Sequence, residues 1–315
     1  MASSLQLMAS RLAEQREARL QAQQVEECRQ LTTLDLTHLK HKQHAEVFTP
    51  DAGTSLLMRA LSSDAATLRA LRPAICVDIG CGAGAEAVHL TRSLPTNSAA
   101  VIATDINPHA LLAARATSVR NGGQPLHLLR SHLLAGLRPG TVDVVVWHCP
   151  YVPTTPAQLE DAKARADLSC SYAGGPGGHM LLKETLGMLR TVLAPGGVMY
   201  LVCYRRTDQP SGKPKALSPS EGGASSGVPA LRDRASARCI SHWVSDELSG
   251  MGVLAHECAA SCAETSHLCV LRCFVDESST PPAHEQQVPV GAADPAAMGL
   301  ACSALAGCDL TEDVD

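Results

Sequence analysis

A glycine-rich turn between a short apolar run and a helical pattern constrains this chain more than any other stretch. Residues 74–77 are apolar and predict a buried strand, and residues 85–94 follow a helical pattern. Gly80, Gly82 and Gly84 lie between the two. Because glycine has no Cβ atom, the backbone N–H groups of such a turn and the N-terminus of the following helix can approach a polar ligand closely. The stretch therefore predicts a ligand-binding strand–turn–helix unit.

Two carboxylates beside this turn indicate the class of ligand. The glycine spacing is G-x-G-x-G, which differs from the G-x-G-x-x-G fingerprint of dinucleotide sites. Asp78 precedes the first glycine by two residues, and Asp105 ends the next apolar run. A carboxylate at Asp78 can hold an ammonium group, and one at Asp105 can accept both hydroxyls of a ribose. Many glycine turns bind nothing, but the turn with both acids favours S-adenosylmethionine as the cofactor.

Strand and helix patterns alternate along the chain, which predicts a doubly wound α/β fold with a mostly parallel, seven-stranded sheet. The expected strands cover residues 74–77, 99–105, 126–130, 142–147, 198–204 and 267–274. The expected helices cover residues 55–71, 85–94, 109–120, 178–193 and 240–251, and Thr54 is expected to cap the first of them. Ligands of such folds bind at the carboxyl ends of the strands, where Asp78, Asp105, His132 and His148 all fall.

Changes in composition predict the domain organisation. Residues 3–31 lack glycine and proline, so residues 1–40 are expected to form a helical N-terminal extension, as a solvated arm rather than a domain cap or a partner contact. The main domain is expected to span residues 41–275, with a flexible insertion rich in Ser, Pro and Gly at about 207–238. Residues 276–315 are expected to be a disordered tail.

Charge and apolar content narrow the class of protein. The 315 residues carry a formal net charge of −5, so no broad attraction to nucleic acid is expected. The sequence has no apolar run of about 18 residues, so no membrane span is expected. Many of the 13 cysteines lie inside apolar runs, as reduced core residues do, and no secretory signal pattern is evident. These features predict a cytoplasmic protein, with the nucleus as an alternative.

Four cysteines have a spacing that suggests a zinc site without matching one. They form two pairs at i, i+4, whereas structural zinc sites use C-x2-C pairs. Two of them also share a face of an apolar strand pattern, so small core residues are the preferred interpretation and no metal site is predicted. The four are Cys258, Cys262, Cys269 and Cys273, with His256 and His267 nearby. Three more histidines, His38, His41 and His44, could share a helix face, but isolated surface histidines are the preferred interpretation.

The tetrapeptide His148-Cys149-Pro150-Tyr151 follows the expected strand at 142–147. It resembles the Asn-Pro-Pro-Tyr tetrapeptide of methyltransferases that act on planar nitrogens. Methyl transfer to a poor nitrogen nucleophile depends on orienting that nitrogen toward the sulfonium methyl group. An Asn side chain offers an acceptor and a donor together, proline stiffens the turn, and the Tyr ring can pack against a planar group. Cys149 has no acid–base partner at a recognised spacing, so no nucleophilic role is expected for it.

These motifs together resemble the HemK-type glutamine methyltransferases. The resemblance extends over residues 47–204 and 267–274, and it is greatest to the eukaryotic and archaeal branch that methylates the Gly-Gly-Gln glutamine of a class 1 translation termination factor. Residues 48–54 resemble the Tyr-Glu-Pro-Ala-Glu-Asp-Thr segment of that branch, and residues 104–108 resemble its second-strand motif. Residues 151–154 and 172–175 resemble the segments that follow the catalytic tetrapeptide, whereas residues 193–197 are shared with many methyltransferases.

The resemblance implies S-adenosylmethionine as the cofactor and two sets of site residues. The cofactor set is Thr54, Asp78, Gly80, Gly82, Gly84, Asp105, Ile106, His132 and Leu133. The catalytic set is His148, Pro150 and Tyr151. The sequence departs from the family pattern in several ways. Ala52 and Gly53 replace Glu and Asp, and His132 replaces an acid near the adenine. In the tetrapeptide, His148 replaces the catalytic Asn and Cys149 replaces the first Pro. Histidine has its donor and acceptor on opposite edges of the ring, so it cannot hold a primary amide side-on as Asn does, although it can accept one N–H bond or act as a base.

The resemblance also implies two protein partners, a termination factor as substrate and a small zinc-binding activator protein. The activator would pair along the strand at 126–130, where Leu126, Leu128 and Leu129 would otherwise leave an apolar edge. Three functions remain open from the sequence: a glutamine methyltransferase, a binding module that has lost methyl transfer, and a methyltransferase for another nitrogen substrate such as a nucleobase or small molecule.

Overall fold

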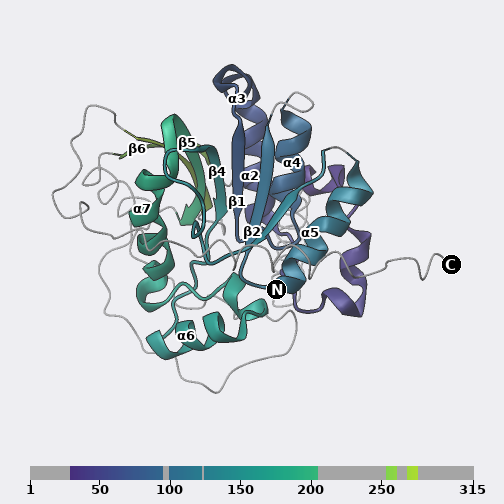
Figure 1. Ribbon diagram of the computed structural model, residues 1–315. Coiled ribbons are helices and arrows are strands. Elements are labelled where there is room, and N and C mark those ends of the chain that lie inside the picture. Colours follow the sequence, from purple (N-terminus) through teal and green to yellow (C-terminus); the bar gives the residue numbers. More distant parts are fainter. Residues whose placement is uncertain (1–28, 95–98, 123, 205–252, 261–267, 276–315) are drawn as a thin grey trace, which may run out of the picture. The chain divides into compact units, whose positions relative to one another are not determined.

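A seven-stranded sheet with helices on both faces makes up the described part of the chain, as the computed structural model in Figure 1 shows. The structure describes residues 29–94, 99–122, 124–204, 253–260 and 268–275. The strands lie in the order β3-β2-β1-β4-β5-β7-β6. Only β7 runs opposite to the other six strands, so the expected mostly parallel, seven-stranded sheet is confirmed. The strands are β1 (Ile75–Ile79), β2 (Ala100–Asp105), β3 (His127–Arg130), β4 (Val142–His148), β5 (Leu193–Tyr204), β6 (Val253–Ala260) and β7 (Leu268–Val275).

Helices fill the connections between the strands. The α-helices described are α2 (Ala52–Ser63), α3 (Ala65–Leu71), α4 (Ala85–Ser93), α5 (Pro108–Asn121), α6 (Pro156–Arg165) and α7 (Met180–Val192). Short 3₁₀ helices are η1 (Arg29–Thr33), η2 (Thr37–Lys40), η3 (Lys42–His44), η4 (Leu168–Ser171) and η5 (Pro176–Gly178). None of the helices described is long and apolar enough to cross a membrane.

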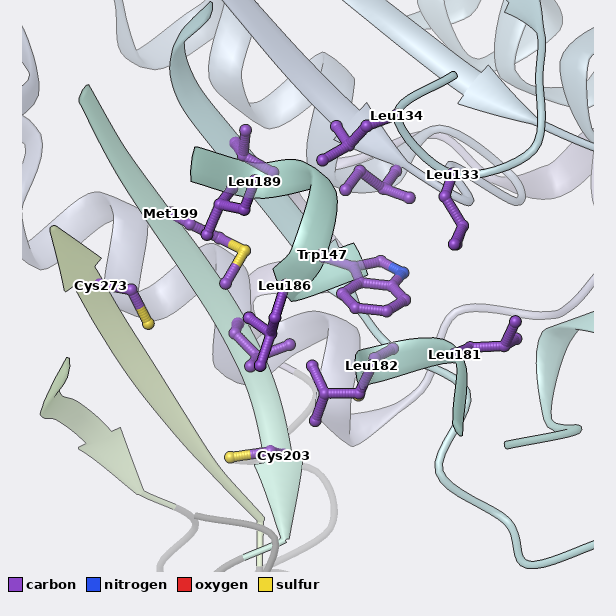
Figure 2. Packing of buried hydrophobic residues seen from close by; sticks show 14 of the residues in the cluster. Leu133, Leu134, Trp147, Leu181, Leu182, Leu186, Leu189, Met199, Cys203 and Cys273 are labelled. Atoms are coloured by element: carbon purple, nitrogen blue, oxygen red, sulfur yellow. The ribbon is translucent and has the colours of Figure 1, made fainter. Parts of the chain in front are cut away.

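The central strands β1 and β4 bury both of their faces, which explains why they read as continuous apolar runs. Cys76, Val144 and Val146 point to one face, where α2, α3, α4 and α5 cover them. Val77, Val145 and Trp147 point to the opposite face, which α7 covers with a row of leucines. Figure 2 shows residues of this second cluster, with Leu189 near the side chain of Met199 and Leu182 near the ring of Trp147. The carboxyl ends of the parallel strands therefore lie together at one end of a sheet that is covered on both faces.

Two of the expected helix boundaries are wrong. The helix expected at residues 55–71 is interrupted at Asp64, which ends α2 and precedes α3. The carboxylate of Asp64 accepts hydrogen bonds from Tyr200 and Arg272, so its tertiary contacts hold the interruption in place. Asp51, not Thr54, caps α2, because its Oδ1 accepts from the N–H groups of Gly53 and Thr54 at 2.8 and 3.2 Å.

Two elements absent from the expected list are α6 and β6. The N-terminus of α6 carries a capping box, in which the Thr155 hydroxyl and the Gln158 side chain each satisfy a backbone N–H group, and Pro156 is its first residue. That signal was present in the sequence. Strand β5 also begins earlier than expected, at Leu193, because residues 194–197 form an irregularity in the ladder with β4, opposite Asp143, instead of a loop.

The segment at residues 29–47 packs against α5 and the glycine turn. His38 and His44 are buried with their rings 5.2 Å apart in an edge-to-face arrangement, so the expectation of isolated surface histidines is wrong for these two. His38 Nε2 lies 3.1 Å from the hydroxyl of Thr117, which in turn donates to the carbonyl of Ala83 in the turn.

Several predictions concern residues that the structure does not describe. They are most of the helix expected at residues 3–31, the insertion at 207–238, the helix at 240–251 and the tail at 276–315. The domain boundaries at 40 and 275 therefore stay predictions.

Candidate cofactor and active site

Backbone conformation and close packing explain why glycine occupies three positions of the turn. Gly80, Gly82 and Gly84 have φ values of 59°, 52° and 76°, which side chains rarely adopt. A Cβ atom at Gly84 would lie 2.7 Å from Cβ of Ala114, so this glycine permits the close contact between α4 and α5. A Cβ atom at Gly82 would meet nothing within 4 Å. The middle of the turn therefore faces open space beside the carboxyl ends of β1 and β2.

Asp105 closes the glycine turn from the neighbouring strand. Its Oδ2 accepts a hydrogen bond from the N–H of Gly82 at 2.9 Å, and its Oδ1 accepts from the N–H of Asn107 at 2.8 Å. A carboxylate has about four lone-pair sites, so these contacts do not exhaust its capacity to accept hydrogen bonds. Burial raises the pKa of Asp105, against hydrogen bonds from Asn107, Gly82 and Ile106 that lower it. The side chain can therefore accept further hydrogen bonds from a ligand that lies against the turn.

Asp78 is almost fully buried at the end of β1, and its Oδ2 has no hydrogen-bond partner among the described residues. Burial raises its pKa well above the ordinary value, and the nearby Glu86 raises it further. A buried acceptor without a partner costs free energy, which a cation or a donor at this position would recover.

Glu86, in the first turn of α4, is a third buried carboxylate that the sequence analysis did not single out. Burial raises its pKa, while proximity to His148 and hydrogen bonds from its own backbone N–H and from Thr54 lower it. In the described part of the chain, no Lys or Arg side chain forms an ion pair with Asp78, Glu86 or Asp105. An acidic residue in the first turn of a helix is usually explained by the helix dipole, so its spacing alone gave no reason to place it in the site.

His148 ends β4 beside these acids. Its Nδ1 lies 3.5 Å from the hydroxyl of Thr54, and its ring lies 5.8 Å from that of Tyr151 and 6.1 Å from that of Phe48, measured between centroids. A Cβ atom at Gly53 would lie only 2.5 Å from Cε1 of this ring. Pro150, like His148, is half-buried in the tetrapeptide that follows β4. The structure therefore brings Thr54 and the catalytic candidates together, across α2 and β4.

His132 and Leu133 lie just beyond β3, at the same edge of the sheet. His132 Nε2 lies 2.9 Å from Oε1 of Glu184 on α7, whose other oxygen lies 3.5 Å from Nζ of Lys163. The acid that the family pattern expects at position 132 is thus replaced by a histidine paired with an acid from a different element. Leu133 is buried with a φ of 52°, an unusual conformation for a branched side chain. The backbone carbonyl of Ile106 accepts a hydrogen bond from the Arg130 side chain, also at this edge.

The cysteines near the site are core residues. Cys149 is buried, donates to the carbonyl of Val202 and has its pKa raised to about 12 by burial, which leaves no thiolate to act as a nucleophile. Cys269 and Cys273 are buried in the cluster beneath α7. Cys258 donates to the carbonyl of Val270, and Cys262 lies outside the described residues.

Comparisons with known proteins place this architecture in a family. Residues 38–164 match the family model described as the methyltransferase small domain. The chain is 30% identical to the mouse (Mus musculus) methyltransferase HEMK2 over 54% of its own length and 78% of the mouse protein. It is 29% identical to the eRF1 methyltransferase catalytic subunit mtq2 of Schizosaccharomyces pombe, over 56% of its length and 80% of that protein.

Among solved structures, that of the E. cuniculi Mtq2–Trm112 complex covers 73% of this chain and 99% of the matched chain, at 19% identity and a TM-score of 0.47. The sequence relatives decide the family, because the mouse protein is matched over most of its length. This chain therefore belongs to the HEMK2-type family of S-adenosylmethionine-dependent methyltransferases.

Proposed function

We propose that this enzyme methylates the side-chain nitrogen of a glutamine in a class 1 translation termination factor. The observation that carries the proposal is that three buried carboxylates, Asp78, Glu86 and Asp105, which we call the acidic edge, lie beside the tetrapeptide at 148–151. The Thr54 hydroxyl links the two parts through its 3.5 Å contact with His148. The names of two groups of relatives support it, because one is an eRF1 methyltransferase subunit and others are release factor glutamine methyltransferases.

The acidic edge fits S-adenosylmethionine, which supplies an electrophilic methyl group on a sulfonium ion. We assign the ammonium group of its amino-acid end to Asp78, whose Oδ2 is buried without a partner among the described residues. We assign the ribose hydroxyls to Asp105, which holds the turn and still has lone pairs to accept them. The open space at Gly82 leaves room for the ligand against the backbone. His132 and Leu133, at the end of β3, are assigned to the adenine end.

The acceptor nitrogen is assigned to the space beside His148. The imidazole can accept one N–H bond of the amide and so orient its nitrogen, while the ring of Tyr151 packs against the planar group and Pro150 stiffens the turn. Because the relatives' Asn offers a donor as well, His148 holds a carboxamide by fewer contacts. This difference favours a second candidate function, the methylation of a planar nitrogen that has no adjacent carbonyl.

The deciding experiment combines cofactor titration with a methyl-transfer assay. Calorimetry should show binding of S-adenosylmethionine, and radiolabelled methyl should appear on the Gly-Gly-Gln glutamine of the termination factor. The His148→Asn variant should lose activity if the imidazole is an adapted orienting group. Cofactor binding without transfer to the termination factor, in both the wild type and the variant, would reject the glutamine substrate and leave the second candidate or a binding module.

We also propose that β3 pairs with a strand of a small zinc-binding activator protein. In the described part of the sheet β3 pairs only with β2, which leaves its second edge open. Leu126 and Leu128 pack against the core but are only partly buried, as is Leu129, so apolar surface remains exposed along β3. An open edge of this kind is a liability for a lone protein, and a partner strand removes it.

A further inference from the structure

Three polar side chains from three different elements form one hydrogen-bonded series in the site. The hydroxyl of Thr54, from α2, lies close enough to the carboxylate of Glu86, from α4, to lower the pKa of that carboxyl as a hydrogen-bond donor. The same hydroxyl oxygen lies 3.5 Å from Nδ1 of His148, at the end of β4. Thr54 and Glu86 are buried, so few water molecules can compete for these hydrogen bonds.

Only one assignment of donors and acceptors satisfies all three side chains of this series. An ionised carboxylate only accepts hydrogen bonds, so the single proton of the Thr54 hydroxyl is used toward Glu86. The hydroxyl oxygen can then interact favourably with His148 only by accepting a proton from Nδ1. A neutral imidazole that carries its proton on Nδ1 has a lone pair on Nε2.

Gly53 determines what lies next to this lone pair. A Cβ atom at position 53 would lie 2.7 Å from Nε2 and 2.5 Å from Cε1, so any side chain there would press on this edge of the ring. The absence of a side chain at position 53 therefore leaves room for this edge of the imidazole.

We infer that Glu86 and Thr54 are positioning residues that hold His148 in the Nδ1–H tautomer, so that Nε2 accepts an N–H bond from the methyl-acceptor nitrogen. The role of Nε2 rests on the proposed function, whereas the tautomer does not. Glu86 thereby acts on the acceptor side of the reaction through two other side chains, without touching the substrate.

The tautomer can be measured without any substrate. Long-range ¹H–¹⁵N correlation spectra of ¹⁵N-histidine-labelled protein at mildly alkaline pH should show a protonated Nδ1 and an unprotonated Nε2 for His148, assigned by loss of the signals in His148→Asn. Thr54→Val, which removes the hydroxyl at nearly constant volume, should shift His148 toward the Nε2–H tautomer. Thr54→Ser should restore the wild-type pattern. The matched control is Thr185→Val, a buried hydroxyl on α7 that bonds only to its own helix, and it should change nothing.

Methyl transfer gives the second readout. Glu86→Gln and Thr54→Val should each reduce kcat by roughly tenfold or more, as expected for a lost hydrogen bond to a charged group, and Thr54→Ser should recover most of it. A wild-type His148 protonated on Nε2, or an unchanged tautomer in Thr54→Val, would overturn the inference whatever the activity. An Nδ1–H tautomer with no transfer to the termination factor would keep the positioning role and reject the glutamine substrate.

Discussion

The imidazole ring of His148 packs directly against Gly53. Where the family pattern has Asn at position 148 and Asp at position 53, this chain has a larger ring and no side chain. The ring of His148 occupies the volume that any Cβ atom at position 53 would need, with contacts of 2.5 and 2.7 Å. The two departures from the family pattern therefore depend on each other, because the larger ring at position 148 requires that position 53 has no side chain.

This fit predicts that Gly53→Ala lowers both stability and methyl transfer. Alanine suits the first turn of a helix, so local propensity alone favours the substitution. The clash with the His148 ring should instead cost about 1–3 kcal/mol, as overpacking does, and should displace the ring. Thermal or denaturant unfolding measures the first effect, and kcat measures the second.

A double-mutant cycle isolates the contact. In a His148→Asn background the shorter side chain does not reach the same space, so Gly53→Ala should be tolerated there. Gly187→Ala, in the interior of α7 where an added Cβ meets nothing within 4 Å, is the matched control and should be neutral or stabilising. Equal costs of Gly53→Ala in both backgrounds would contradict the fit.

At the scale of elements, the open edge of β3 is the feature with a direct test. Alternate residues of a parallel strand bond to the same neighbour, and the N–H of Ser131 bonds to Asp105 in β2. The N–H of Arg130 therefore points to the open edge, where a partner strand would accept it.

Arg130→Pro should weaken the complex with the zinc-binding activator, because proline has no N–H to donate. Arg130→Ala removes the same side chain and keeps the N–H, so it should bind like the wild type. Co-expression followed by affinity co-purification and calorimetry compares the three proteins. Equal binding by the proline variant would show that the partner does not use this edge.

For the whole molecule, the buried acids predict an unusual dependence on pH. Burial raises the pKa values of Asp78, Glu86 and Asp105. Between the ordinary carboxyl pKa and the raised values, the native state binds more protons than the unfolded state, so these groups lower the free energy of unfolding as pH rises. The ionised form attracts the cationic cofactor, so affinity for S-adenosylmethionine should rise over the same range. Thermal melts and calorimetry across pH measure the two trends.

The comparison with Asp78→Asn makes this test specific. His38 and His44 have lowered pKa values, mainly through burial, so they add stability as pH rises and oppose the trend. The difference between wild type and variant removes their contribution, and Asp78→Asn should be less sensitive to pH and bind the cofactor more weakly. If the variant bound the cofactor like the wild type, the assignment of the ammonium group to Asp78 would be rejected.

Periodicity was sufficient to find most of the fold. The apolar runs that became β1, β2, β4 and β7 are buried, so their pattern is strong and their predicted ends differ from the observed ones by a residue or two. Strand β6 was missed because it lies at an edge, where less apolar character is needed. The interruption at Asp64 was missed because it depends on Tyr200 and Arg272, which are far away in sequence.

The same division applies to the site. Local sequence was enough to single out the glycine turn, Asp78 and Asp105 as candidates, and the family resemblance added the tetrapeptide at 148–151, because each belongs to one strand and the turn that follows it. Glu86 beside Asp78, Glu184 beside His132 and Gly53 beneath the His148 ring emerged only from the packed structure. Each of these pairs joins residues from different elements, and sequence spacing carries no information about contacts that form only when separate elements pack against one sheet.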